Sequence, residues 1–246
     1  MSRFAVVLAA AGKSTRFHDQ YYKKPFIPLE GKPVWLHSAE KFLNRPDVKQ
    51  MLIVISPEDH EPFHSKFGAN VAILGLDVVT GGAERTDSVL NALSRVRADI
   101  DYVAIHDAAR PCLAETWIDE VFAAAEKSGA ALLGVPVTST LKRVGADRRV
   151  VETVPRADLW EAQTPQVFRR QLLLDAYAHR GTAPATDDAQ LVERLGHPVT
   201  IVPGSPLNLK ITTKDDLRLA AHALKALPKP KGLEGLNPFA GGDLWR

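Results

Sequence analysis

The chain contains one cysteine, Cys112, among its 246 residues. A lone thiol excludes an internal disulfide and a zinc site built from cysteines, and it fits a reducing compartment. No apolar run approaches the length of a membrane span. The apolar run that follows Arg3 is interrupted by Gly12 and Arg16, too early for a signal peptide. We therefore expect a soluble, cytoplasmic protein with no membrane partner.

Neither sign of charge dominates the chain. The 31 lysines and arginines are balanced by 29 aspartates and glutamates, which leaves a net charge of +2. Such a balance gives no support for general binding to nucleic acids or membrane surfaces. Any functional cations must therefore act as local clusters, within a chain whose length suits one α/β domain.

What the chain does contain is an alternation of short apolar runs and segments with helical spacing. Strands are expected from Phe4 onward and over residues 51–55, 71–79, 102–105, 130–136 and 199–202. Helices are expected over 33–45 and 58–67, from the Gly81-Gly82 turn to about 96, and over 115–127, 170–179 and 214–227. This order predicts an α/β fold, with a mostly parallel sheet covered by helices on both faces and joined by right-handed crossovers.

Three unusual loops follow three of the expected strands. They are the loop around Gly12, the Gly81-Gly82 turn and the segment His106–Arg110, which includes Ala108. Ligands of open parallel sheets bind beyond the carboxyl ends of the strands. The convergence of three such loops at one edge of the sheet predicts an active site there.

The first loop has the composition of a polyphosphate site. Ala10 and Ala11 are small enough to let a ligand approach the backbone, and Gly12 permits a tight turn. Exposed amides can bind an anion there, and Arg16 and Lys24 add fixed positive charge. The loop matches neither G-x-x-x-x-G-K-[ST] nor G-x-G-x-x-G.

The alternation breaks in the second half of the chain. Residues 140–144 and 150–154 alternate in polarity around Gly145 and Asp147, which predicts a β-hairpin. Because an isolated hairpin is only marginally stable, its apolar side must pack on its own domain or on another subunit. We expect one domain over 1–227, with this arm at about 138–156, and a tail rich in proline and glycine over 228–246.

Several polar residues at the loops have two interpretations. Asp107 can bind Mg²⁺, or it can cap the following turn or pair with Arg110. For His106 we expect a hydrogen-bonded structural role. Ser88 can satisfy helix amides or bind a nucleotide base. Lys210 can be solvated or contact a phosphate. Three further residues are ordinary strand and surface residues or form a second anion site: Thr140, Arg156 and Thr164.

Six short segments with residues suited to bind a nucleotide or phosphate follow one another along the chain. They are Ala-Ala-Ala-Gly12-Lys-Ser-Thr-Arg16-Phe, Lys24, Gly81-Gly82-Ala-Glu-Arg85-Thr-Asp-Ser88-Val, His106-Asp107-Ala-Ala-Arg110-Pro, Thr164-Pro-Gln and Asn208-Leu-Lys210-Ile-Thr. Together they closely resemble the 2-C-methyl-D-erythritol 4-phosphate cytidylyltransferase family of the non-mevalonate isoprenoid pathway, over about residues 4–227. The resemblance implies a Rossmann-like nucleotidyltransferase fold and a homodimer whose β-arms interlock.

The resemblance also implies roles for individual residues. Arg16, Lys24 and Gly12 match those that hold the triphosphate of CTP, and Gly82 and Ser88 match those that read cytosine. The chain departs from the family at Ala83, where many relatives have aspartate, so base selection must depend more on backbone groups and Ser88.

For the second substrate and the metal, the matches lie farther along the chain. Asp107 matches the ligand of Mg²⁺ (other divalent cations are possible), and Arg110 lies in the ribose-binding segment. Thr140 and Arg156 match residues that reach the polyol phosphate from the partner subunit, and Lys210 matches a second phosphate-binding lysine. The expected catalytic residues are Arg16, Lys24 and Lys210. The expected substrate-binding residues are Ala10, Ala11, Gly12, Gly82, Ser88, Asp107, Ala108, Arg110, Thr140, Arg156 and Thr164.

The implied reaction transfers CMP from CTP to 2-C-methyl-D-erythritol 4-phosphate and releases pyrophosphate. A related cytidylyltransferase acting on ribitol 5-phosphate is the alternative, and an inactive nucleotide-binding regulator is a third. The set Arg16, Lys24, Asp107 and Lys210 argues against the regulator. Some relatives are fused to the later cyclodiphosphate synthase, so the tail is either a linker of that kind or a simple terminus.

Overall fold

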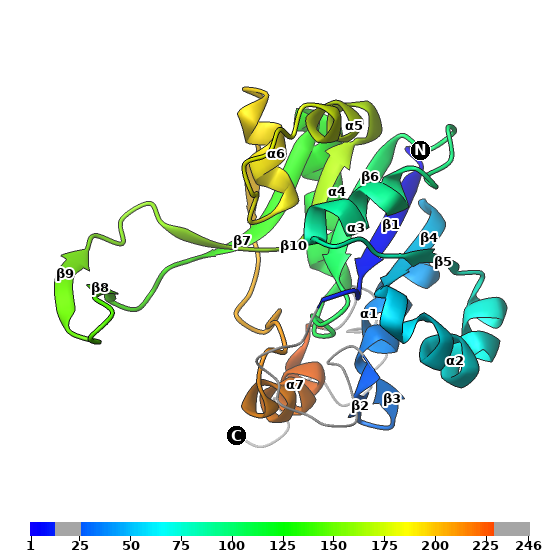
Figure 1. Cartoon of the computed structure of the whole chain (residues 1–246), viewed down its shortest axis with the longest axis horizontal. Helices are drawn as coiled ribbons and strands as arrows, with labels where there is room; N and C mark the ends of the chain where they lie inside the picture. Colours follow the sequence, from blue (N-terminus) through cyan, green and yellow to red (C-terminus); the bar gives the residue numbers. More distant parts are fainter. Residues whose placement is uncertain (13–25, 229–246) are drawn as a thin grey trace, which may run out of the picture.

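The computed structural model describes residues 1–12 and 26–228, and within them a seven-stranded sheet lies between two layers of helices (Figure 1). From edge to edge the strands are β11 (Thr200–Pro203), β7 (Ala130–Pro136), β10 (Trp160–Arg169), β6 (Tyr102–Asp107), β1 (Phe4–Ala9), β4 (Val48–Ile55) and β5 (Asp77–Thr80). The helices are α1 (Val34–Leu43), α2 (His60–Leu74, after the 3-10 turn η2, Pro57–Asp59), α3 (Arg85–Leu93), α4 (Glu115–Ser128), α5 (Arg170–Ala178), α6 (Asp188–Arg194) and α7 (Lys214–Ala226). No helix among the described residues is long and apolar enough to cross a membrane.

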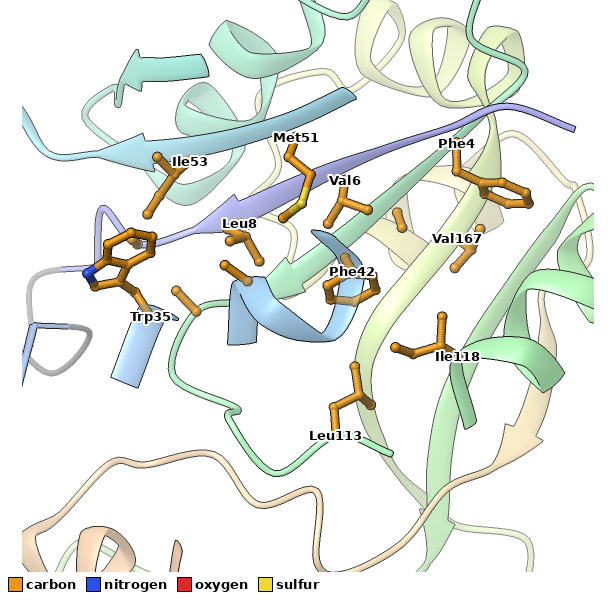
Figure 2. Close-up of a cluster of buried hydrophobic side chains, with 14 of the residues drawn as sticks. Phe4, Val6, Leu8, Trp35, Phe42, Met51, Ile53, Leu113, Ile118 and Val167 are labelled. Atoms are coloured by element: carbon orange, nitrogen blue, oxygen red, sulfur yellow. The ribbon is translucent and has the colours of Figure 1, made fainter. Parts of the chain in front are cut away.

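Strand β1 lies near the middle of the sheet and is buried on both faces. It pairs in parallel with β4 and with β6. Its alternate side chains enter opposite cores, so that Val6 and Leu8 pack toward α1, α2 and α4, whereas Ala5 and Val7 pack toward α3, α5 and α6. Figure 2 shows the first of these cores, with Trp35 of α1 beside the strand. The predicted α/β fold is confirmed.

Strand β10 makes the sheet mixed, and it is not among the strands predicted from the sequence. It runs antiparallel to both β6 and β7, between which it lies. Its apolar part is short, because Val167 and Phe168 are the fully buried hydrophobic residues, and Pro165 lies just before them. A proline inside a run argues against a central strand, and here it coincides with a register shift between Ala162 and Gln166.

The predicted strand over 71–79 is wrong in its first half. Helix α2 continues to Leu74, and Gly75 ends it with the left-handed conformation (φ 63°). The helix continues because Phe63, Phe67 and Val71 recur at every fourth residue and pack on the same core. Only Asp77–Thr80 is left for β5.

The predicted hairpin is confirmed. Strands β8 (Leu141–Val144) and β9 (Val150–Val154) form a separate two-stranded sheet that stands away from the body (Figure 1). A second small sheet, β2 (Pro28–Leu29) with β3 (Lys32–Pro33), precedes α1. The predicted tail from residue 229 onward lies outside the described residues, and so does residue range 13–25 with Arg16 and Lys24.

Candidate active site

The three predicted loops converge around one pocket of about 710 Å³ at the carboxyl ends of β1, β5 and β6. Seven of the predicted site residues line it: Ala10, Ala11, Gly12, Gly82, Ser88, Asp107 and Lys210. Parallel strands place their carboxyl ends at the same edge, which is why the loops after β1, β5 and β6, about a hundred residues apart in the sequence, meet here.

The phosphate-type loop and the glycine turn touch each other. The Gly81 amide donates to the Ile55 carbonyl at 2.7 Å, which continues the pairing of β4 and β5 into the loop. A side chain at Gly81 would bring its Cβ within 2.8 Å of the Ala11 Cβ. At Gly82, a Cβ would lie 2.4 Å from that of Asp87. Both glycines are therefore required by close approach, and their backbone faces the pocket.

Ser88 closes the turn that carries these glycines. Its hydroxyl accepts a hydrogen bond from the Gly82 amide (3.0 Å) and donates to the Glu84 carbonyl (3.0 Å). Glu84 and Asp87 form a reciprocal capping box at the start of α3. Ser88 thus braces the loop, and the prediction that it reads a base stays a prediction.

Asp107 is the acidic centre of the pocket. Its Oδ2 lies 2.7 Å from the Lys210 Nζ and 3.6 Å from the Arg110 Nε. Burial alone would raise the pKa of Asp107, but the positive charges of Lys210, Arg85 and Arg110 outweigh burial and hold it below its ordinary value. The carboxylate is therefore ionised throughout the physiological range.

Lys210 reaches the pocket from a segment without regular secondary structure that hydrogen bonds hold in place. The Ile211 amide donates to the Ala109 carbonyl (2.9 Å), and the Arg110 Nη1 donates to the Asn208 carbonyl (2.7 Å). The buried Asn208 donates from its Nδ2 to the Thr164 carbonyl (2.9 Å). The segment is thereby tied to the loop after β6 and to β10.

His106 and Thr164 support the end of β6 from within. The Asp107 amide donates to the Thr164 Oγ1 (3.0 Å), so the single hydroxyl proton of Thr164 is available for the His106 Nδ1 at 3.0 Å. The His106 Nε2 then donates to the Arg110 carbonyl (3.1 Å). Burial lowers the pKa of His106 to about 4, which agrees with this neutral tautomer. The expected structural role of His106 is confirmed.

Two more predicted residues border the pocket from inside the protein. Ala108 is fully buried, and its carbonyl accepts from the Ser38 hydroxyl (3.0 Å). Thr164 is buried behind Asp107. In contrast, Thr140 and Arg156 are exposed at the base of the arm and do not line the pocket of this chain.

Arg85, for which the sequence indicated no role, lines the pocket together with Asp107. Burial disfavours its charge, yet the neighbouring carboxylate of Asp188 raises the pKa of Arg85 above its ordinary value. A signal was present in the sequence, because Arg85 is the first residue of α3, where a cation opposes the helix dipole. A cation at that position is stabilised by an anionic partner.

The residues of this pocket fit a divalent cation such as Mg²⁺ only if the substrate contributes ligands. Among the described residues, no group of three His, Cys, Asp or Glu side chains is placed to hold a metal ion. Asp107 offers one carboxylate, and Mg²⁺ is commonly bound by one or two carboxylates together with substrate phosphates and water. The donor set therefore suits a magnesium–nucleotide complex rather than a resident metal.

A sheet of this kind, with a glycine-lined pocket at its strand ends that holds Asp107 and Lys210, is suited to the phosphates of a nucleotide, as in a nucleotidyltransferase. The family model for 2-C-methyl-D-erythritol 4-phosphate cytidylyltransferase (IspD) matches residues 4–226. The chain belongs to this family, and it is a cytidylyltransferase of the non-mevalonate isoprenoid pathway.

Individual relatives agree with this assignment. The 2-C-methyl-D-erythritol 4-phosphate cytidylyltransferase of Rhodopirellula baltica is 43% identical over 231 residues, which cover 89% of this chain and 94% of that protein. The bifunctional enzyme IspD/IspF of Desulfotalea psychrophila is 39% identical, over 94% of this chain and 59% of that protein. The crystal structure of the Thermus thermophilus enzyme superposes with a TM-score of 0.74 at 32% identity, covering 89% of this chain and 98% of that one.

Proposed function

We propose that the pocket binds CTP, with its triphosphate over the loop of residues 10–12 and its base at the Gly81–Ser88 turn. The observation that carries this proposal is the convergence of both loops on Asp107 and Lys210 in one pocket. Small side chains at Ala10, Ala11 and Gly12 let the phosphates approach backbone amides. Arg110 and Ala108 then belong to the segment beneath the ribose.

In the proposed reaction, a phosphate oxygen of 2-C-methyl-D-erythritol 4-phosphate attacks the α-phosphorus of CTP. The new P–O bond forms as the bond to the departing pyrophosphate breaks. The attacking phosphate is already ionised near neutral pH, so no general base is needed. Catalysis rests on positioning and on charge stabilisation. Among the described residues Lys210 supplies positive charge, and we assign the same role to Arg16 and Lys24 because they match the family's triphosphate-binding residues.

Asp107 is the residue that would hold Mg²⁺ in this proposal. When bound, the cation would neutralise charge on the triphosphate. The ion pair between Asp107 and Lys210 keeps the carboxylate ionised and the lysine directed into the pocket before substrate arrives. Arg110 holds the Lys210 segment by its bond to Asn208.

We further propose that the arm of one chain completes the second-substrate site of another. Thr140 and Arg156 are exposed and outside the pocket, so in a single chain they have no access to the proposed transfer site. In a homodimer whose arms exchange, the same residues would bring a cation and a hydroxyl to the polyol phosphate.

A substrate panel tests the function. We expect pyrophosphate release from CTP with 2-C-methyl-D-erythritol 4-phosphate, and little with ribitol 5-phosphate or without an acceptor. Preference for ribitol 5-phosphate would identify that compound as the acceptor, and no release of pyrophosphate with any acceptor would refute the proposed reaction.

Lys24→Ala should lower kcat by roughly a hundredfold or more, as the loss of a transition-state donor does. A near-normal kcat would remove Lys24 from the mechanism.

A further inference from the structure

The pocket has a second supporting structure behind its nucleotide end, formed by two ion pairs that cross between helices. The Arg85 Nη2 lies 2.6 Å from the Asp188 Oδ2, and the Arg180 Nη2 lies 3.0 Å from the Asp87 Oδ1. Arg85 and Asp87 belong to the first turn of α3, whereas Asp188 begins α6 and Arg180 follows α5. The charges are reciprocal, because each side contributes one cation and one anion.

The first of these pairs is the more deeply buried. The Asp188 side chain is inaccessible to solvent, and its Oδ1 accepts from the Tyr177 hydroxyl at 2.5 Å. A buried carboxylate needs such partners, since an unpaired charge in the interior is strongly unfavourable. Arg85 in turn lies at the N-terminus of α3, where the helix dipole disfavours a cation and the Asp188 carboxylate offsets that effect. Each residue therefore depends on the other.

The first turn of α3 is also what shapes the glycine turn of the pocket. Ser88 holds the Gly82 amide and the Glu84 carbonyl, and Asp87 holds the Glu84 amide (3.2 Å). A rotation or fraying of this turn would move the Gly82 backbone directly. Arg85 itself lines the pocket, so its ion pair acts at the pocket wall.

On the other side, α6 is anchored to the strand that supports Asp107. The Gln166 side chain donates to the Asp187 Oδ2 (2.8 Å) and accepts from the Ala189 amide (3.0 Å). Gln166 lies on β10, two residues after Thr164, whose hydroxyl holds the Asp107 amide. The Arg85–Asp188 pair thus joins the nucleotide end of the pocket to the strand behind Asp107.

We infer that Arg85 is a positioning residue, which acts through Asp188 to hold the Gly81–Ser88 turn in the geometry that binds the nucleotide. This inference rests on the proposed use of the pocket for CTP. It extends that proposal to a residue that acts behind the turn and to a partner on a different helix.

The test compares variants by calorimetric binding of CTP and by steady-state kinetics. Arg85→Gln should weaken CTP binding and raise the KM for CTP by about tenfold, the size expected for one coupled interaction. The KM for the polyol phosphate should change much less. Arg85→Lys should recover part of the loss, because a single nitrogen makes the contact with Asp188.

Two further variants separate positioning from general destabilisation. Arg45→Gln removes a comparable arginine, paired with Asp47 and Asp119 and remote from the pocket, and should lower the melting temperature without changing CTP affinity. The double variant R85Q/D188N should bind CTP no worse than Arg85→Gln alone. If Arg85→Gln does not fold, Arg180→Gln tests the same turn through its more exposed pair.

The outcomes are distinct. Unchanged CTP affinity in Arg85→Gln, or an equal loss in Arg45→Gln, would overturn the inference. Additive losses in the double variant would show that Arg85 does not act through Asp188. Wild-type protein that binds CTP but releases no pyrophosphate would refute the proposed reaction and leave the binding comparison decisive for Arg85. Wild-type protein that does not bind CTP would refute both.

Discussion

Two adjoining stretches of the chain differ in what covers their apolar residues. At the end of β10, Val167 and Phe168 are fully buried between the sheet and its helices. In the arm that precedes this strand, Val144, Val150 and Val151 are 55%, 60% and 67% exposed. Figure 1 shows the arm standing clear of the body that buries β10.

The difference indicates which parts of the molecule are complete in one chain. The pocket around Asp107 is held by contacts from β1, β6, β10 and the Lys210 segment, all within the same chain. The arm has β-branched residues suited to a sheet surface, but the described part of this chain supplies no cover for them. The body is therefore expected to fold and bind nucleotide alone, whereas the arm is expected to act on a partner.

The largest expected effect comes from a substitution at the centre of the pocket in the body. Asp107→Asn removes the carboxylate that pairs with Lys210 and Arg110. We expect kcat to fall by about a hundredfold to a thousandfold, as for the loss of other preorganised charge stabilisation. Pyrophosphate release measures it. Asp119→Asn, an exposed aspartate paired with Arg45, is the control that should retain activity. Equal activity in the two variants would contradict the role of Asp107.

The second effect separates the arm from the body. Val150→Asp places a charge on the exposed apolar side of the arm, and it should weaken self-association by at least about tenfold, which corresponds to about 1.4 kcal/mol. Sedimentation velocity measures the association of the proposed dimer. Ile73→Asp is the matched control, since Ile73 is an apolar residue that is 84% exposed on α2. A dimer that survives Val150→Asp, or that Ile73→Asp disrupts equally, would place the interface elsewhere.

The predictability of the fold also differs between the body, whose strands are buried within one chain, and the arm, whose apolar residues are exposed. Strands such as β1, buried on both faces, produce continuous apolar runs, and the loops after them must meet at one edge, so the pocket could be located from the sequence. Strand β10 could not, because Pro165 interrupts a run whose buried hydrophobic part is only two residues long. The hairpin was predictable from its alternation of apolar and polar residues, but the local sequence does not indicate which surface packs against it.

Within the site, residue types indicated which side chains bind ligands, but they did not indicate which side chains contact each other. Asp107 and Lys210 were expected to bind ligands, and they also pair with each other across 103 residues of sequence only because β6 and the 207–212 segment meet in space. The Arg85–Asp188 pair was missed for the same reason. Its sole local signal was a cation at a helix N-terminus, and its partner is chosen by the placement of α6.

A third, smaller effect sharpens the assignment of the arm to the second substrate. Arg156 lies at the base of the arm, outside the pocket of its own chain. Arg156→Ala should raise the KM for the polyol phosphate by about tenfold while the KM for CTP changes little, because a phosphate contact would be lost from one substrate only. Initial-rate kinetics with each substrate varied in turn measures both. Equal effects on the two KM values would contradict the assignment.

The smallest expected effect concerns the contacts that hold the Lys210 segment, which has no regular secondary structure, in place. Asp216, near the start of α7, accepts hydrogen bonds from the Thr212 amide (2.8 Å), the Thr212 hydroxyl (2.6 Å) and the Thr213 amide (2.8 Å). Burial alone would raise the pKa of Asp216, but these bonds outweigh it and lower the pKa below its ordinary value.

A carboxyl group whose pKa is lower in the folded state stabilises the fold above the unfolded-state pKa of about 3.9 and loses that contribution as the pH falls through the folded-state value. Asp216→Asn should therefore lower the melting temperature by a few degrees at pH 7, and the difference from wild type should shrink as the medium becomes strongly acidic. Asp215→Asn, on the adjacent exposed position, is the control for loss of a charge in the first turn of α7. A difference that does not change with pH would show that the Asp216 carboxylate does not hold the segment through its charge, and the positioning of Lys210 would then rest on Asn208, Arg110 and Ile211 alone.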